Sequence, residues 1–346
     1  MAYNTALPQA TATDDRASDV RAFWKRALVF VLIGLALYLV LLVIAEMRVR
    51  ATGERNPFYQ IVTAAPEDAD VVILGASHAM PLGFEGITPL LEENASRNVT
   101  VLAMEGGGVV PNALMLDALL RKSEPRTIVY VLDTFAFLSH QWNEERLNDS
   151  DLYARAPLDG AVLSALIDEP ASWRNIPAYL LGFDKVNRIL DPGVDRSEAE
   201  LTKFDRTYRP NDRIDDQRVA YLFPDAPVEL MQGYVDRLAG MAAAAQQAGS
   251  EFILLLMPVP QRYTSRLPES HQAVMEQIGE IAQAQKLCVI DHTEALPDDE
   301  NYYDTDHLNR TGTERYVTGL LAEALRSPSG DSSGDQTASV SCGSAR

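Results

Sequence analysis

Short apolar runs alternate with longer amphipathic stretches between residues 70 and 326, and this alternation predicts the fold. Helical periodicity predicts helices over residues 111–122, 228–248, 269–286 and 311–326. The apolar runs predict strands, because they are short, β-rich and bounded by turn residues: 71–74, 99–103, 128–132, 252–257 and 287–290. Continuously apolar strands that alternate with helices are typical of a parallel sheet buried on both faces, so we predict a three-layer α/β/α domain.

Residues 27–45 (ALVFVLIGLALYLVLLVIA) contain neither a charged residue nor a proline. At ~1.5 Å rise per residue a helix of this length covers roughly 28 Å, close to the bilayer hydrocarbon thickness of about 30 Å. The run is longer than the apolar region of a cleavable signal peptide, and the following EMRVR is a poor cleavage context. We therefore predict a transmembrane signal anchor over residues 27–47; a cleaved signal peptide and a buried soluble helix are the alternatives.

Basic residues flank this segment on both sides, with a slight excess before it. Under the positive-inside rule this favours a cytoplasmic leader over residues 1–26 and an extracytoplasmic domain over residues 60–326. Residues 327–346 are rich in serine and glycine and predict a disordered tail.

Residues 138–227 interrupt the alternation of strands and helices. They contain many charges and prolines together with six aromatic residues: Trp142, Tyr153, Trp173, Tyr179, Tyr208 and Tyr221. We interpret the segment as an insertion between the third and fourth strands. It either lines a substrate groove or is a helical elaboration without contact to substrate.

Charge and cysteine content narrow the possible partners. The formal net charge of −19 argues against nucleic acid, because a phosphate backbone would be repelled. Cys288 falls in a predicted strand and Cys342 in the predicted tail, so we expect no structural disulfide between them.

Several chemically distinctive segments follow the predicted strands directly. Ser77 follows the first strand, Gly106–Gly108 the second, Asp133 the third and residues 258–262 the fourth. In an open parallel sheet, ligands bind outside the carboxyl ends of the strands. These segments are therefore expected to meet at one edge of the sheet.

Ser77 is the candidate nucleophile, since a turn after a strand exposes a side chain and directs backbone N–H groups toward a developing oxyanion. The alternative is a serine that caps a helix. The sequence Gly75-Ala76-Ser77-His78-Ala79 lacks the second glycine of the Gly-x-Ser-x-Gly elbow. His78 is a poor candidate base for Ser77, because adjacent residues seldom face each other.

The candidate base and acid lie near the end of the domain. His307 and Asp304 are three residues apart in a polar loop, a separation at which a turn brings the carboxylate to one imidazole nitrogen and leaves the other free. Asp306 is the alternative orienting acid, and Asp304, Asp306 and His307 together are a weaker candidate metal site. Asp291-His292 after the fifth strand is a competing base.

Two further features have plain alternatives. Gly106 and Gly107 are candidate oxyanion donors or part of an ordinary loop, and they lack the spacing of a dinucleotide-binding motif. His140 and His271 lie among polar residues and are expected to be solvated.

Three blocks resemble the SGNH (GDSL-type) hydrolase superfamily: ILGASHA at 73–79, AMEGGG at 103–108 and DTDHLNRTG at 304–312. The resemblance covers roughly residues 70–136 and 250–325, and it implies a flavodoxin-like three-layer sheet. It further implies Ser77 as nucleophile, His307 as base, Asp304 as orienting acid and Gly106 or Gly107 as oxyanion glycine.

The chain departs from the family pattern at two positions. Ala76 replaces the usual acid before the serine, and Asp133 stands where an oxyanion asparagine is expected. A carboxylate at this position would repel an oxyanion unless it were protonated or turned away.

One span followed by such a domain also resembles the membrane-anchored SGNH-like proteins of bacterial polysaccharide and cell-wall O-acylation. This resemblance implies an inner-membrane protein with a periplasmic catalytic domain, a multi-spanning membrane acyltransferase as partner, and no cofactor. We therefore predict an anchored serine acyl-ester enzyme acting on a polysaccharide or another acyl ester. A GDSL-type lipase or esterase, and an inactive SGNH-like accessory protein, are the alternatives.

Overall fold

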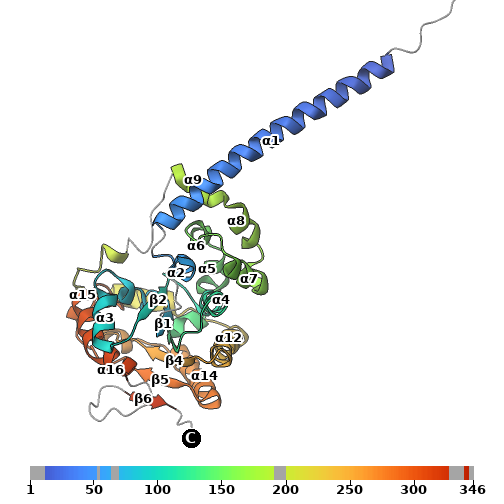
Figure 1. The fold of residues 1–346 in the computed structure, drawn as a ribbon. Helices are drawn as coiled ribbons and strands as arrows, with labels where there is room; N and C mark the ends of the chain where they lie inside the picture. Colours follow the sequence, from blue (N-terminus) through green and yellow to red (C-terminus); the bar gives the residue numbers. More distant parts are fainter. Residues whose placement is uncertain (1–11, 53–54, 64–69, 191–199, 327–338, 343–346) are drawn as a thin grey trace, which may run out of the picture.

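A computed structural model of the chain describes residues 12–52, 55–63, 70–190, 200–326 and 339–342. Its most prominent feature is a long helix, α1 (Ala12–Thr52), that projects from an α/β domain (Figure 1). Part of the predicted leader, residues 12–26, is therefore helical and continuous with the apolar run, while residues 1–11 lie outside the described residues. The short helix α2 (Pro57–Thr63) leads into the domain.

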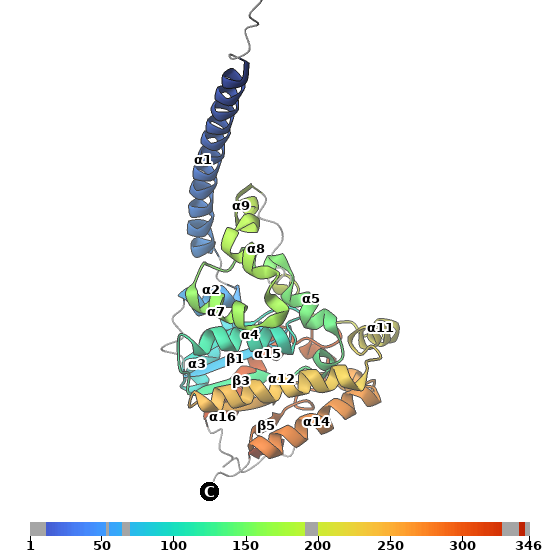
Figure 2. The same ribbon diagram turned by 90° about the vertical axis from the view of Figure 1, so that its right-hand side faces the viewer.

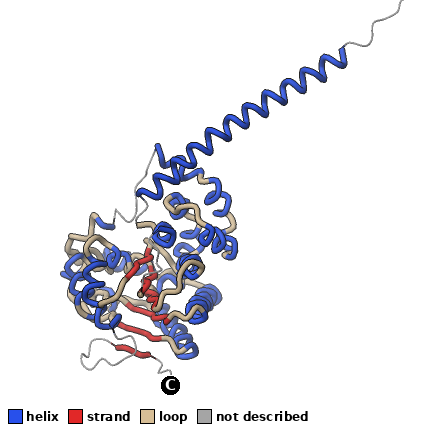
Figure 3. The backbone as a smooth tube through the Cα atoms, in the orientation of Figure 1, coloured by secondary structure: helices blue, strands red, loops and turns tan. Residues whose placement is uncertain are grey.

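The domain is built on a sheet with the strand order β2-β1-β3-β4-β5-β6 (Figure 3). The first five strands are parallel: β1 (Val71–Gly75), β2 (Val99–Ala103), β3 (Thr127–Val131), β4 (Glu251–Leu256) and β5 (Cys288–Asp291). Each lies within one residue of its predicted position. The order 2-1-3-4-5 is that of flavodoxin-like folds, so the predicted fold class is confirmed.

The strands bury both faces because their residues alternate between two cores. Val72 and Leu74 of β1 pack in one core beneath α4 (Val109–Leu120), α12 (Val228–Gln247) and α14 (Glu269–Gln285). Val71 and Ile73 pack in the other beneath α3 (Ile87–Ala95), α15 (Arg310–Thr318) and α16 (Leu320–Arg326). Figure 2 shows α4, α12 and α14 together on the face nearest the viewer.

One predicted helix is divided in the structure. The segment 311–326 forms α15 and α16, which are separated by Gly319 at φ −110° and ψ −107°. Glycine adopts such a conformation readily because it has no Cβ. The helical periodicity on both sides of Gly319 did not indicate this break.

The insertion consists of short helices on the α1 side of the domain followed by a segment that returns over the sheet edge. The first part contains η4 (His140–Trp142), α5 (Glu144–Leu147), α6 (Ser150–Ala154), α7 (Gly160–Asp168), η5 (Pro170–Ser172), α8 (Asn175–Leu181) and α9 (Phe183–Leu190). The returning part carries α11 (Asp212–Leu222). Short helical segments also follow the strands: η2 (Met80–Gly83), η3 (Thr134–Phe137), α13 (Gln261–Thr264) and η6 (Asp299–Asn301).

The C-terminal segment differs from its prediction. Residues 339–342 form β6 (Ser339–Cys342), which pairs antiparallel with β5 and places Cys342 opposite Cys288 in the register. Cys288 is disulfide-bonded, and Cys342 is the other cysteine of the chain, so the expectation of no disulfide is wrong. Strand pairing brings distant segments together, which composition alone did not reveal. The remaining tail residues lie outside the described part of the chain.

Candidate active site

Ser77 lies in a tight turn between β1 and η2. A Cβ atom on Gly75 would lie 2.7 Å from Cβ of Ala79 and 2.9 Å from Cβ of Val131, so the chain passes here closer than any other residue allows. Gly75 is thus needed for close packing, not for an unusual φ. The helix after the turn has Ala79 as its N-cap, so Ser77 does not cap it.

The structure brings Ser77, His307 and Asp304 together. Nε2 of His307 lies 2.8 Å from the Ser77 hydroxyl oxygen, and its Nδ1 lies 2.9 and 3.0 Å from the two carboxylate oxygens of Asp304. The backbone N–H of His307 also donates to Asp304, which locks the turn. Tyr303 stacks on the imidazole with ring centroids 5.5 Å apart and planes 7° apart. The contacts orient one nitrogen toward an acid and the other toward a hydroxyl.

Asp306 has different partners from Asp304. It is fully buried, and its two oxygens accept hydrogen bonds from Arg218 at 3.1 to 3.4 Å. Its nearest approach to Nδ1 of His307 is 3.5 Å, longer than an ordinary hydrogen bond. Of the two candidate acids, the structure therefore pairs Asp304 with the imidazole.

His78 is turned away from Ser77 and lies between two carboxylates. Its Nδ1 contacts Asp133 directly, and its Nε2 lies 3.4 Å from Asp306. Its ring lies 4.7 Å from that of His307. The carboxylate of Asp133 is thus engaged by a buried imidazole, which offsets the charge that made this position unfavourable for an oxyanion site.

The protonation of this group follows from its charges. Burial disfavours a charged His78, but Asp133 and Asp306 outweigh burial and raise the pKa of His78 to about 10. Burial also disfavours the Asp306 carboxylate, yet Arg218 and the two imidazoles hold its pKa well below the usual range. For Asp304, His307 outweighs burial and lowers the carboxyl pKa. At neutral pH the site thus contains ionised carboxylates beside a cationic His78.

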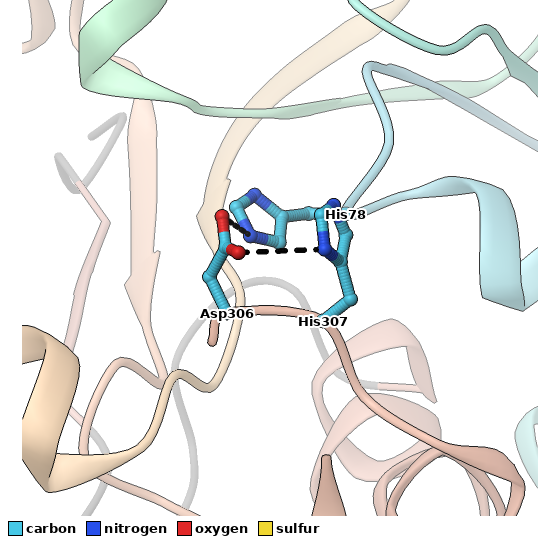
Figure 4. Close-up of side chains that lie close together, drawn as sticks. All are labelled: His78, Asp306 and His307. Carbon is cyan, nitrogen blue, oxygen red and sulfur yellow. Dashed lines mark ion pairs between the residues drawn. The ribbon is translucent and has the colours of Figure 1, made fainter. Parts of the chain in front are cut away.

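The same region contains a group of side chains that resembles a metal site. One ligand atom each of His78, Asp306 and His307 lie within 4.8 Å of one another, and Asp306 directs one carboxylate oxygen toward each ring (Figure 4). However, both nitrogens of His307 have partners in Ser77 and Asp304, and both oxygens of Asp306 accept from a guanidinium. A cation would have to displace these bonds beside a positive charge. The donor set therefore fits a metal poorly.

The loop after β2 supplies a backbone N–H group near the serine. Gly106 lines the same cavity as Ser77 and has a left-handed φ of +64°. The carbonyl of the preceding residue, Glu105, accepts a hydrogen bond of 2.8 Å from Nε of Arg146. Because C=O and N–H point in opposite directions across a trans peptide, this bond fixes the direction of the Gly106 N–H.

Gly107 has a different role. Its N–H donates to the carbonyl of Met104 at 3.1 Å, so it is engaged within the loop. Asn112 braces the loop, because its side-chain amide donates to the carbonyls of Gly107 and Gly108 at 2.8 Å each. Of the two candidate oxyanion glycines, Gly106 is the one that the geometry favours.

A cavity of about 190 Å³ opens over the serine and the imidazole. The insertion supplies half of its lining: Trp142, Glu200, Lys203, Arg218, Tyr221 and Leu222. The insertion therefore lines the groove, which was one of the two readings of its aromatic and charged composition. Arg218 and Lys203 could not be identified as site residues from the sequence. No motif in residues 200–222 indicates that they lie near Ser77 in the fold.

The other histidines lie apart from the serine. Nδ1 of His292 lies 2.9 Å from the Tyr316 hydroxyl, and burial lowers the pKa of His292 to about 4. His292 thus does not act on Ser77. His140 is exposed and contacts Glu144, whereas His271 is half-buried beside Thr134, at variance with the expectation that it is solvated.

No protein-family model and no curated protein sequence matches the chain. Among solved structures, the chain is similar to TesA at 14% identity, over 73% of this chain and 97% of that one, with a TM-score of 0.35. It is also similar to a GDSL-like lipase from Bacteroides thetaiotaomicron at 11% identity, over 81% of this chain and 99% of that one, with a TM-score of 0.40.

These likenesses are distant, so the strand order and the side-chain contacts of this chain define its class. A flavodoxin-like sheet with a serine after β1, and an imidazole and carboxylate in the loop before α15, form a site of the serine ester hydrolase type. The strand order and these contacts agree with the predicted flavodoxin-like α/β/α fold class.

Proposed function

We propose that the protein is a membrane-anchored serine acyl-ester enzyme that transfers an O-acyl group, such as acetyl, to or from an extracytoplasmic polysaccharide. The observation that carries the proposal is the 2.8 Å contact between Ser77 and His307, whose other nitrogen is held by Asp304. A serine so placed loses its proton to the imidazole as it attacks.

The reaction consists of two acyl transfers. The Ser77 oxygen bonds to the acyl carbon while His307 takes the hydroxyl proton; the ester C–O bond then breaks, and His307 returns the proton to the leaving alcohol. A sugar hydroxyl or water next attacks the acyl-serine and gives its proton to His307, which passes it to Ser77. The N–H of Gly106 is the proposed oxyanion donor in both steps.

The two departures from the family pattern, Ala76 and Asp133, favour the alternative of an inactive accessory protein. The contact between Asp133 and His78 weakens that support, because a buried imidazole engages the carboxylate through one of its oxygens.

The cavity supports a short acyl group and a polar acceptor. Its volume of about 190 Å³ is below the range of roughly 300–1,000 Å³ for sites that enclose a drug-sized ligand. Trp142 and Tyr221 offer aromatic surfaces, while Glu200 and Lys203 offer hydrogen-bond partners for hydroxyl groups. This composition favours a sugar over a long aliphatic chain.

The N-terminal helix supports the anchoring part of the proposal. An apolar window of α1 has a mean hydropathy of 3.2 and no buried residue, as expected for a helix surrounded by lipid. Ala45, the last residue of the apolar run, and Val49 beyond it are buried, so the end of the helix is part of the fold. A cleaved signal peptide would not be built into the mature core in this way.

The disulfide at Cys288 supports an oxidising compartment and hence a periplasmic domain. With the domain on that side, a multi-spanning membrane acyltransferase is the proposed partner that brings the acyl group across the membrane.

The test uses the full-length protein in lipid nanodiscs, with 4-nitrophenyl acetate as donor and an oligosaccharide as acceptor. We expect nitrophenol release together with an acetylated oligosaccharide by mass spectrometry, both lost in Ser77→Ala and retained in the matched control Ser265→Ala at an exposed serine. Nitrophenol release without acetylated sugar would favour a simple esterase, and activity in Ser77→Ala would overturn the proposal.

A further inference from the structure

Exposed apolar side chains outside α1 are concentrated in one part of the insertion. Among the described residues beyond α1, five of the eight exposed large hydrophobic side chains fall between residues 167 and 183. Three of them, Leu180, Leu181 and Phe183, flank Gly182 in the turn between α8 and α9 and are 45%, 60% and 60% exposed. Such a group of apolar side chains in water normally marks a contact surface.

The turn between α8 and α9 lies against the apolar part of α1. The Tyr38 hydroxyl donates to the Leu181 carbonyl at 2.6 Å, and a Cβ on Gly182 would overlap the Leu42 side chain. Both views show α8 and α9 as the part of the domain that lies nearest to α1 (Figures 1 and 2). The turn therefore lies at the same height along the axis of α1 as Tyr38 and Leu42.

The contacts along α1 show how far the α8–α9 turn lies from the end of the charge-free run. Tyr38 is seven residues before Ala45, the last residue of the charge-free run, and this separation corresponds to roughly 10 Å along a helix. Glu46, the residue directly after Ala45, pairs with the buried Lys185 at the start of α9, where Asp184 is the first charged residue after Phe183. Leu181 and Gly182 thus lie level with the apolar part of α1, and the Glu46–Lys185 pair lies at its end.

The backbone of the turn is suited to an apolar environment. Gly182 N–H donates to the Ala178 carbonyl at the end of α8, and the Leu181 carbonyl accepts from Tyr38. Backbone groups that enter lipid must be paired within the protein, because lipid offers no partners. The Gly182 N–H and the Leu181 carbonyl are thus paired within the protein, as contact with lipid would require.

We propose that the α8–α9 turn inserts Leu180, Leu181 and Phe183 into the outer leaflet beside α1, so that the domain is fixed to the bilayer at two points. Interfacial elements bury their apolar face about 5–10 Å into this region, which matches the level of Tyr38 and Leu42. Two attachment points would hold the catalytic cavity at a constant height and orientation over the membrane. This inference rests on the anchor of the proposed function but not on the chemistry.

The experiment uses full-length Phe183→Trp protein in nanodiscs whose lipids carry bromine near the headgroup end of the acyl chains. Bromine quenches tryptophan fluorescence on contact. The fluorescence of residue 183 is obtained by subtracting the wild-type emission from that of the Phe183→Trp variant. We expect loss of most of this added emission. The matched control is Glu276→Trp, an exposed position on α14 at the far side of the domain, whose added emission should stay unquenched.

The native Trp24 of α1 separates the possible failures. Its emission, obtained from the difference between wild type and Trp24→Phe, reports whether α1 is in the bilayer. Quenching of Trp24 without quenching at position 183 would overturn the inference and point to a protein covering the turn, with the anchor intact. No quenching at either position would overturn the anchor as well. Ester hydrolysis, measured on the same samples, reports the chemistry independently.

Discussion

At the residue scale, Asp304 and Asp306 are close in sequence but differ in their partners. The Asp304 carboxylate accepts hydrogen bonds from the imidazole and from the backbone N–H of His307. Asp306 is instead buried against Arg218 and His78. The first arrangement orients an imidazole, and the second neutralises buried charge. Substitution of the two residues by asparagine should therefore have different consequences.

We expect Asp304→Asn to lower kcat on the order of 10⁴-fold with little change in stability, because an amide favours the wrong imidazole tautomer. Asp306→Asn should instead destabilise the fold by about 3–5 kcal/mol, because it leaves buried cations without their partner. Steady-state kinetics and urea unfolding of the two variants provide the comparison. A larger kcat loss in a stable Asp306→Asn protein would reverse the assignment of the orienting acid.

His78 makes the stability of the protein depend on pH. Its pKa is raised from 6.5 to about 10 in the folded protein, so its contribution is complete below pH 6.5 and is lost as the pH rises through about 10. We expect the free energy of unfolding to fall across this window, and His78→Gln to have lower stability and a flatter dependence. Urea titrations of both proteins from pH 6 to 10 measure the difference. Parallel curves would show that His78 is not charged in the fold.

At the element scale, the strands were predictable because each is a continuous apolar run, and a parallel sheet buried on both faces requires no other pattern. The parallel order then carried Ser77 and Gly106 to one edge. The strand β6 was not predictable, because it depends on pairing with β5, a segment distant in sequence. The break at Gly319 was not predictable from the helical periodicity, which continues on both sides of the glycine. The pairing of Asp133 with His78 was not predictable either, because it joins the ends of two strands, β3 and β1. The sequence indicated only that a carboxylate at position 133 would repel an oxyanion.

The β2–α4 loop provides a test in which strain and function can be separated. Gly106→Ala places a side chain at a left-handed φ and 3.1 Å from Trp142, while Gly86→Ala meets the same strain at φ +82° in open space. Both should lose about 1–2 kcal/mol of stability. We expect only Gly106→Ala to lower kcat strongly, because it disturbs the proposed oxyanion donor. Equal activity in both variants, measured with a short acyl ester, would remove Gly106 from the site.

At the scale of the whole molecule, the end of α1 belongs to the folded domain. One residue at each of four successive turns of α1 contacts the insertion. The pairs are Tyr38 with Leu181, Leu42 with Gly182, Glu46 with Lys185, and Arg50 with Leu158. The sequence predicted the span from its length, but the contacts needed the folded insertion. They give a structural reason for the prediction that the anchor is not cleaved.

We therefore expect the mature protein to retain its first residues and to partition with membranes. Intact mass spectrometry of the protein from the membrane fraction measures the first point. A mature chain that begins near residue 46 would show that the segment is a signal peptide and that the contacts of α1 are not maintained.

The central claim is that Ser77 is the activated nucleophile, and the most direct measurement is covalent labelling of the intact protein with a fluorophosphonate. Mass spectrometry should find one adduct, on Ser77, and its rate of formation should fall by about 10⁴–10⁶-fold in His307→Ala. A folded protein that remains unlabelled, or that is labelled at another serine, would contradict the account.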